Sequence, residues 1–348
     1  MTALKKITIV GGGLAGLTVG IGLRQHGLPV TLFEAGRLPR HRVCGEFISG
    51  RGQQTLERLG LRELFDRAGA GQAETAAFYS TRFRGPARRL PTPALCLPRF
   101  KMDALLARRF AELGGELREN SRWREAGFGE GVVRATGRKA QPVERGVRWC
   151  GLKVHARRVA LEADLEMHLG ADGYVGLCRL DDGKVNVCGL FRRAVASATD
   201  ERVRWQELLQ GVEGSPLGEH MAEAEFDLDS FCAVAGLSLA PHRALGRNEC
   251  VLGDALTMIP PITGNGMSMA YEAAETAIEP LAAYSQGAMG WSEAQRSLAG
   301  QLDRNFASRL AWARAFQRLA FHPVLREALL PLIFHSEWLW RWVFEKTR

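Results

Sequence analysis

The sequence lacks the marks of a metal site and of a disulfide scaffold. Its seven cysteines form no CxxC pair, and its eight histidines show no spacing typical of metal ligands, so we expect no bound metal. An odd number of scattered cysteines indicates reduced thiols and predicts a cytoplasmic protein. The cysteines stand at positions 44, 96, 150, 178, 188, 232 and 250.

Long apolar runs and lysine-rich runs are also missing. No uninterrupted apolar stretch reaches the ~18 residues that are needed to span a bilayer. The N-terminus runs directly into a predicted strand, so we expect no cleaved signal peptide. No lysine-rich run alternates with aromatic residues, which argues against a nucleic-acid partner. The formal charge of +8 indicates instead an attraction to anionic cofactors, acidic proteins or membrane headgroups.

One glycine-rich stretch near the N-terminus predicts a dinucleotide site. A β-branched run over residues 7–10 predicts a buried parallel strand, and glycines spaced G-x-G-x-x-G follow it before a helical pattern begins. The first glycine permits the tight turn, the second admits a pyrophosphate, and the third lets the helix pack on the strand. The N–H groups at the helix start attract phosphates, and an acid at the end of the second strand can bind a ribose. We expect this site to consist of Gly11, Gly13, Leu14, Ala15, Gly16 and Glu34.

A second stretch, over residues 251–267, predicts another helix start that attracts negative charge. A strand ends in Asp254, a loop rich in proline and glycine follows, and that loop opens a long helix. An aspartate at a strand end can bind the hydroxyls of a polyol, and the first N–H groups of the helix can stabilise negative charge on a ring carbonyl. We expect cofactor contacts from Gly253, Asp254, Pro261, Gly264, Gly266 and Met267.

The remaining segments predict a second layer of structure. Alternating strands with Asp-Gly turns over residues 147–191 indicate an antiparallel sheet inserted into the first domain. Residues 201–228 predict mostly helix. The expected fold is α/β, with a Rossmann-like dinucleotide-binding domain, an inserted antiparallel substrate domain and a helical C-terminal tail. The expected ranges are 1–75, 96–140 and 235–285 for the first domain, 76–95 and 141–234 for the substrate domain, and 286–348 for the C-terminal helices.

Basic residues and one cysteine lie near these motifs. Arg42, in a basic loop beyond the dinucleotide motif, can reach phosphate or ribityl oxygens, and a solvated basic loop is the equal alternative. Arg99 begins a predicted helix and points back towards the first domain. Cys44 precedes Gly45, which leaves room for a planar ring to come close, and nearby arginines favour its thiolate. The other interpretation of Cys44 is a small buried packing residue.

Together the motifs resemble the flavoprotein superfamily of aromatic hydroxylases (p-hydroxybenzoate hydroxylase-like) and geranylgeranyl reductases. The first motif resembles its ADP-binding motif, the second its ribityl and isoalloxazine motif, and Arg99-x-x-x-Asp103 the helix whose arginine contacts FAD. The resemblance covers about residues 5–285. It implies FAD as the cofactor, with NADPH or NADH as the electron donor.

The branch of this superfamily follows from smaller motifs. Arg42-Val43-Cys44-Gly45 is most similar to the geranylgeranyl reductases, and Tyr174 stands where those reductases place Tyr-x-Trp, although Gly176 replaces the tryptophan. The resemblance makes Cys44 and Tyr174 the candidate catalytic residues. Hydroxylases carry Asp-Gly in the middle motif, where this chain has Thr136-Gly137. Some residues also resemble flavin-dependent halogenases, but their Trp-x-Trp-x-Ile-Pro motif is missing, so we set halogenation aside.

The favoured function is hydride transfer from reduced flavin to a C=C bond of a hydrophobic biosynthetic molecule, free or carrier-bound. One alternative is an NAD(P)H-dependent monooxygenase that hydroxylates an aromatic or polyketide substrate. Another is a flavin-binding cyclase or carrier-docking protein without net redox turnover. The tail with Trp338, Trp340 and Trp342 packs on the inserted sheet or, alternatively, rests on membrane lipid as a basic, tryptophan-rich surface.

Overall fold

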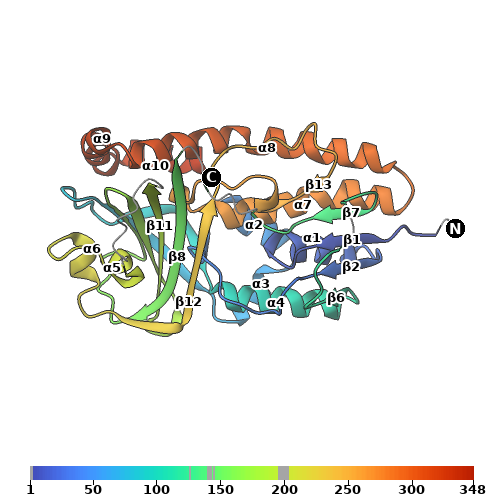
Figure 1. Cartoon of the computed structure of the whole chain (residues 1–348), viewed down its shortest axis with the longest axis horizontal. Helices are drawn as coiled ribbons and strands as arrows, with labels where there is room; N and C mark the ends of the chain where they lie inside the picture. The colour runs from blue at the N-terminus through green and yellow to red at the C-terminus, as the bar shows by residue number, and fades with distance from the viewer. Residues whose placement is uncertain (1–2, 125–126, 139–142, 144–145, 195–203) are drawn as a thin grey trace.

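The computed structural model places the chain in two sheets and a layer of helices (Figure 1). The residues that it describes are 3–124, 127–138, 143, 146–194 and 204–348. The five-stranded sheet lies towards the N-terminal label, the eight-stranded sheet lies towards the other end, and the long helix α8 (Trp291–Ala320) runs past both. This arrangement confirms the expected α/β fold with a Rossmann-like domain, a second sheet and a helical tail.

The five-stranded sheet is parallel, in the order β13-β7-β1-β2-β6. Its central strand has the sequence ITIV, and β-branched side chains suit a strand that is covered on both faces. The carboxyl ends of parallel strands meet at one edge, which brings together the turn after β1, the acid after β2 and the loop after β13. The strands are β1 (Ile7–Val10), β2 (Val30–Phe33), β6 (Glu116–Arg118), β7 (Val132–Arg134) and β13 (Cys250–Val251).

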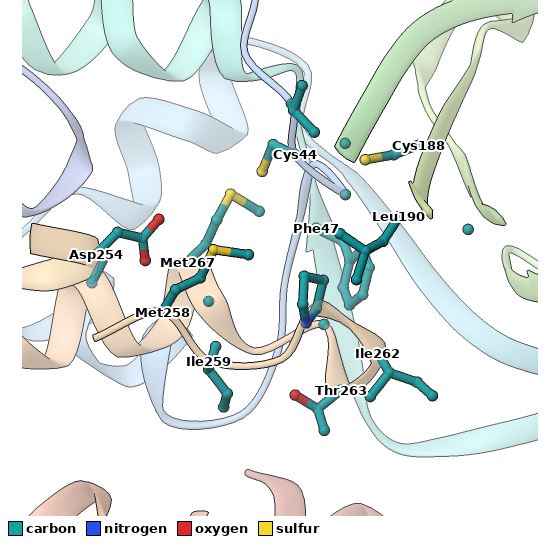
Figure 2. A pocket seen from close by; sticks show the side chains of 18 of the residues that line it. Cys44, Phe47, Cys188, Leu190, Asp254, Met258, Ile259, Ile262, Thr263 and Met267 are labelled. Atoms are coloured by element: carbon teal, nitrogen blue, oxygen red, sulfur yellow. The ribbon is translucent and has the colours of Figure 1, made fainter. Parts of the chain in front are cut away.

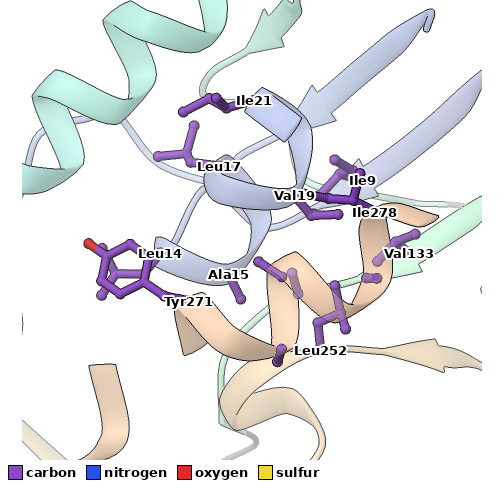
Figure 3. Close-up of a cluster of buried hydrophobic side chains, with 14 of the residues drawn as sticks. Ile9, Leu14, Ala15, Leu17, Val19, Ile21, Val133, Leu252, Tyr271 and Ile278 are labelled. Carbon is purple, nitrogen blue, oxygen red and sulfur yellow. The ribbon is translucent and has the colours of Figure 1, made fainter. Parts of the chain in front are cut away.

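Three helices pack around this sheet: α1 (Leu14–Gln25), α4 (Arg99–Glu112) and α7 (Gly266–Ser285). Helices α1 and α7 approach closely because α1 carries glycine at the contact. A Cβ atom at Gly22 would lie 2.2 Å from Cδ1 of Ile278. Figure 3 shows the buried apolar cluster that the two helices share with the sheet. This packing fixes the start of both helices at the same edge of the sheet.

The eight-stranded sheet has the order β12-β8-β11-β10-β9-β4-β5-β3. The strands within residues 147–191 are antiparallel to one another, as predicted, but β4 and β9 are parallel, so the sheet as a whole is mixed. The parallel pair forms because two groups of strands, separated by a return through the first domain, meet at β9. The strands are β3 (Phe47–Ile48), β4 (Gly71–Tyr79), β5 (Arg88–Cys96), β8 (Val147–Arg157), β9 (Leu165–Leu169), β10 (Gly173–Arg179), β11 (Val185–Ala194) and β12 (Glu225–Leu237).

The segment before β12 is less helical than predicted. It holds two short helices, α5 (Trp205–Gln210) and α6 (Pro216–His220), and residues 201–203 lie outside the described part. From Glu225 the chain is a strand that pairs with β8, so the helical expectation is wrong over residues 225–228. Pairing with a neighbouring strand outweighs the local helical spacing there.

The C-terminal helices cover the junction of the two sheets. After α8 come α9 (Pro323–His335) and α10 (Glu337–Thr347), and the C-terminal label lies between the sheets (Figure 1). Trp340 is 4% exposed, Trp342 is half-buried and Trp338 is 69% exposed, so the three tryptophans do not form one surface. Among the described residues, no helix combines the length and the apolar character that crossing a bilayer requires. Two further short helices are α2 (Arg51–Arg58) and α3 (Arg62–Arg67).

Candidate functional site

A cavity of about 710 Å³ lies where the carboxyl edge of the five-stranded sheet meets the eight-stranded sheet and the C-terminal helices. Figure 2 shows part of it, with Cys44, Asp254 and Met267 around the same space as Leu190 and Ile262. The cavity brings together nearly all of the site residues that the sequence predicted. They are Gly11, Gly13, Leu14, Ala15, Glu34, Arg42, Cys44, Arg99, Tyr174, Gly253, Asp254, Pro261, Gly264, Gly266 and Met267.

Gly16 is the predicted site residue that does not line the cavity. A Cβ atom at Gly16 would lie 1.9 Å from the carbonyl oxygen of Gly11, so its part is to let the helix pack on the turn. Gly11 itself has φ +114°, which only glycine adopts readily, and a Cβ there would lie 2.2 Å from the oxygen of Ala135. Gly13, which caps α1 without a side-chain hydrogen bond, has open space beside it. The turn is therefore shaped for a phosphate that binds the free N–H groups of α1.

Glu34 holds this turn in place from the end of β2. Its Oε2 accepts a hydrogen bond of 2.8 Å from the amide of Gly12. Its Oε1 accepts from the amide of Gly36 and from Nη2 of Arg40, each at 3.0 Å. The buried carboxylate thus orders the glycine-rich turn as well as facing the cavity, where a ribose can donate to it.

Two arginines share one buried aspartate beside this end of the cavity. Arg99 donates to Asp103 Oδ1 at 2.9 and 3.1 Å, and Nε of Arg42 donates to Oδ2 at 3.0 Å. Although burial would lower the pKa of Arg99, the charge of Asp103 raises it overall. Nη2 of Arg42 is buried and has no partner among the residues that the structure describes, and burial lowers the pKa of this guanidinium. An unpaired donor of this kind fits an anionic or polyol oxygen of a bound cofactor.

The second predicted motif forms another part of the cavity wall. Asp254 lies in a short turn after β13, and burial raises its pKa. Helix α7 begins at Gly266 without a side-chain cap, so its first N–H groups are free to stabilise negative charge. Gly264 has φ +63°, and a Cβ there would lie 2.1 Å from the ring of Phe47, so the loop must be glycine at this point. The open turn at α1, the unpartnered Nη2 of Arg42 and the uncapped start of α7 together fit FAD.

The two candidate catalytic residues both stay protonated at neutral pH. Burial raises the pKa of the Cys44 thiol and outweighs the opposing charge of Arg99, so the expectation of a favoured thiolate is wrong. Burial also raises the pKa of Tyr174, whose hydroxyl donates to Gln317 Oε1 at 3.1 Å. Neither residue is therefore suited to act as a base; the Cys44 thiol can donate into the cavity, whereas the Tyr174 proton is already bound to Gln317.

Sequence reasoning missed a buried charged cluster directly behind Cys44. Glu46 lies 2.6 Å from Nε2 of His155 and 3.5 Å from Nζ of Lys153, and Nζ in turn lies 3.2 Å from Nδ1 of His41. Although burial would raise the pKa of Glu46, His155 and Lys153 lower it overall. Glu46 has φ +61°, an unfavourable conformation for a residue with a Cβ. The alternation of Lys153 and His155 on one face of a buried strand was the available clue.

The sequence also missed a group of histidines that the fold collects. Glu166 Oε2 lies 3.0 Å from Nε2 of His168 and 2.7 Å from Nδ1 of His220, and the three residues are buried. They offer atoms within 4.8 Å of one another, an arrangement that the histidine spacing did not reveal. Glu166 also accepts hydrogen bonds from the amides of Glu162 and Ala163. These hydrogen bonds hold the three residues together, and Nδ1 of His168 is buried with no partner among the described residues.

The far wall of the cavity comes from the C-terminal tail. Aromatic side chains of β4 and the last two helices meet there: Phe78 stacks on Phe334 with ring centroids 4.5 Å apart, and Phe334 lies 5.4 Å from Trp340. Phe344 and Arg348 line the same wall. The sequence predicted that the tail packs on the second sheet, and it gave no sign that the tail encloses the site.

Comparisons with known proteins agree with this geometry. The family model described as "FAD binding domain" matches residues 5–179, which is half of the chain. The chain is 34% identical over 103 residues to 6-methylpretetramide 4-monooxygenase of Streptomyces rimosus, a match covering 29% of this chain and 25% of that protein. It is 32% identical over 80 residues to squalene epoxidase of Aspergillus fumigatus, covering 23% of this chain and 16% of that protein. The matches thus span a quarter or less of these curated relatives.

A solved structure extends the likeness to the whole fold. The flavin-dependent brominase Bmp2 superposes with a TM-score of 0.77 over 99% of this chain and 93% of that one, at 18% identity. At this identity the likeness concerns the fold alone. The family match and the cavity that fits FAD lead to the same conclusion. The chain belongs to the FAD-binding domain family and is a flavoprotein of the FAD-dependent oxidoreductase superfamily.

Proposed function

We propose that this protein is an FAD-dependent monooxygenase that adds one atom of molecular oxygen to an apolar substrate held between the eight-stranded sheet and the C-terminal helices. The observation that carries the proposal is a single cavity that joins the dinucleotide turn to an apolar chamber. The names of both curated relatives support the oxygen chemistry, because a monooxygenase and an epoxidase each add one oxygen atom. Because of these two relatives we prefer a monooxygenase to the reductase that the sequence favoured.

The chemistry of the proposal needs a cofactor, a reductant and a dry chamber. FAD supplies two electrons, taken from NADPH or NADH, that allow one oxygen atom to enter the substrate while the other leaves as water. The chain's own part is to exclude bulk water with the apolar walls of the chamber. Leu169, Leu190 and Phe334 belong to those walls. The protonated Cys44 thiol can orient a substrate oxygen by donating a hydrogen bond, and the hydroxyl oxygen of Tyr174 can accept one while its proton binds Gln317.

The test is reoxidation of the reduced holoenzyme. Protein loaded with FAD is bleached with NADPH or NADH without oxygen and is then mixed with buffer that contains the heavy isotope of oxygen. The probes are 1-naphthol and squalene, one aromatic and one polyene. The proposal expects one heavy oxygen atom in the product of at least one probe. Reoxidation by oxygen that yields only hydrogen peroxide with every member of a wider apolar panel would contradict it.

A reductase remains the second candidate because of Cys44. A protonated thiol at the cavity wall can deliver the proton that must reach one carbon of a C=C bond after hydride reaches the other. Geranylgeraniol added to the reduced protein without oxygen separates the two candidates. Reoxidation of the flavin together with a saturated product would favour the reductase, and Cys44→Ser would then slow that step. Failure of NADPH, NADH and dithionite to support any turnover would favour the flavin-binding protein without redox function.

We also propose that the apolar substrate arrives from a lipid surface through the tail. Helix α9 buries Leu330, which lines the cavity, and exposes Val324 and Leu332, while α10 exposes Trp338. Exposed apolar side chains on the helices that wall the cavity suit contact with lipid. Flotation with neutral and anionic vesicles tests this contact, and Trp338→Ser should lower the bound fraction. Equal, background-level binding to both vesicle types would contradict the contact.

A further inference from the structure

Arg348 occupies an unusual place in the cavity. It follows α10, in the region where the C-terminal label lies between the two sheets (Figure 1), and it lines the cavity. Its stem packs on Gly50, where an added Cβ would lie 3.0 Å from Cβ of Arg348. The preceding residue is anchored to the loop before α7, because Nδ2 of Asn265 donates to the carbonyl oxygen of Thr347 at 2.7 Å. The guanidinium is therefore held at a defined position beside the second cofactor motif.

No acid among the described residues pairs with this guanidinium. Nη1 donates to Oγ1 of Thr347 at 3.0 Å, and the guanidinium lies 4.6 Å from the ring centre of Phe344. Nε is buried and has no partner in the described part of the chain. Burial and the positive charge of Arg309 lower the pKa of Arg348 to about 9, so it remains a cation at neutral pH. Arg348 as a whole is partly exposed, but its Nε is buried, and a cation held in such a site without a counter-ion gains from a ligand that supplies the charge.

Two other arginines of the C-terminal helices, Arg309 and Arg326, are paired with acids, and they provide the comparison. Arg309 makes two hydrogen bonds of 2.7 and 3.0 Å to Glu272. Arg326 pairs with Glu327 and donates to the carbonyl oxygen of Gly170. Arg348 alone of these three lacks a carboxylate within the described part of the chain. The missing partner is an anion that would enter with a ligand.

The surroundings define the rest of that ligand. Side chains that line the cavity with Arg348 are largely apolar, among them Trp340, Val343 and Phe344 on the same helix. We infer that the substrate of the proposed monooxygenase is an apolar molecule with one carboxylate, and that Arg348 binds this carboxylate. A planar guanidinium suits a carboxylate because two parallel N–H···O bonds can form. This inference rests on the proposed function in one respect, namely that the cavity is the substrate site.

Binding of two matched probes to the FAD-loaded protein tests the inference without turnover. The probes are 2-naphthoate and 2-naphthylmethanol, which share an apolar body and differ in charge. Binding is followed by tryptophan fluorescence and by changes in flavin absorption. We expect the parent to bind 2-naphthoate more tightly than 2-naphthylmethanol. Arg348→Gln should weaken the affinity for 2-naphthoate by about 10- to 100-fold and leave the affinity for 2-naphthylmethanol unchanged. Arg348→Lys should retain part of the preference because it keeps the charge and loses the planar fork.

The control is Arg341→Gln on the same helix, which removes an exposed arginine paired with Glu337 and should change neither affinity. FAD content and melting temperature verify that each variant is folded. Equal affinity of the parent for both probes, equal weakening of both in Arg348→Gln, or no binding of either probe would overturn the inference. A changed flavin spectrum and weaker FAD binding in Arg348→Gln without any probe would instead assign the guanidinium to the cofactor. Because no step needs NADPH or oxygen, failure of the proposed function leaves these results interpretable.

Discussion

Replacement of Glu34 by alanine should weaken FAD binding without unfolding the protein. The change removes the acceptor of three hydrogen bonds, from the amides of Gly12 and Gly36 and from Arg40, at 2.8, 3.0 and 3.0 Å. The Gly12 amide lies in the buried glycine-rich turn, and a buried donor without a partner costs about 1–3 kcal/mol. That turn is the one shaped for the pyrophosphate, so its loss of order adds to the loss of the ribose acceptor. We expect the Kd for FAD to rise by about 5- to 150-fold.

Glu34→Gln sharpens this prediction, because it preserves shape and removes charge. A glutamine can accept from Gly12 through its oxygen, but its NH₂ group then faces the two donors Gly36 and Arg40. We therefore expect a Kd between those of the parent and Glu34→Ala. The matched control is Glu112→Ala, which removes an exposed acid that pairs with Arg109 at 3.4 Å.

The assay is titration of apoprotein with FAD, followed by the change in flavin fluorescence. Melting temperatures of the apoproteins separate a binding effect from a folding effect. Glu112→Ala shows the effect of losing one acidic charge. If Glu34→Ala binds FAD as tightly as Glu112→Ala and the parent do, the carboxylate of Glu34 neither orders the turn for FAD nor binds the ribose.

Three further predictions concern the turn, the thiol and the histidine cluster. Gly16→Ala should abolish FAD binding and lower the free energy of unfolding by about 1–3 kcal/mol, because its Cβ would lie 1.9 Å from a carbonyl oxygen. The control in the same titration and melt is Gly290→Ala, whose Cβ would lie in open space. Cys44→Ser should keep FAD bound and change product ratios, since the thiol lines the cavity; unaltered products with stability lower by about 1 kcal/mol would make Cys44 a packing residue. The hydrogen bond to Glu166 raises the pKa of His220, so protonated His220 stabilises the fold fully below pH 6.5 and less as pH rises above it. The difference in free energy of unfolding between the parent and His220→Gln should therefore be largest below pH 6.5 and shrink at higher pH. Urea unfolding across pH measures this, and a loss independent of pH would contradict it.

The sequence by itself determined the parts of the site that depend on local geometry. The spacing of Gly11, Gly13 and Gly16 predicts the turn because each glycine answers a constraint within one strand–turn–helix unit. Glu34 and Asp254 follow from strands that end at the same edge of a parallel sheet, so topology alone brings them together. These motifs are short and their geometry repeats, which is why the cofactor end of the cavity could be predicted.

Only the tertiary structure decided the substrate end. Arg348 meets Gly50 and the Asn265 loop through contacts between segments far apart in the chain, and no local pattern specifies such packing. The same holds for β4 beside β9, and for His220 beside Glu166, which depends on where α6 lies against the sheet. The state of the Cys44 thiol also depended on the fold, because neighbouring arginines predicted a lowered pKa and burial raised it. Burial is a property of the whole packed chain, so residue order alone could not supply it.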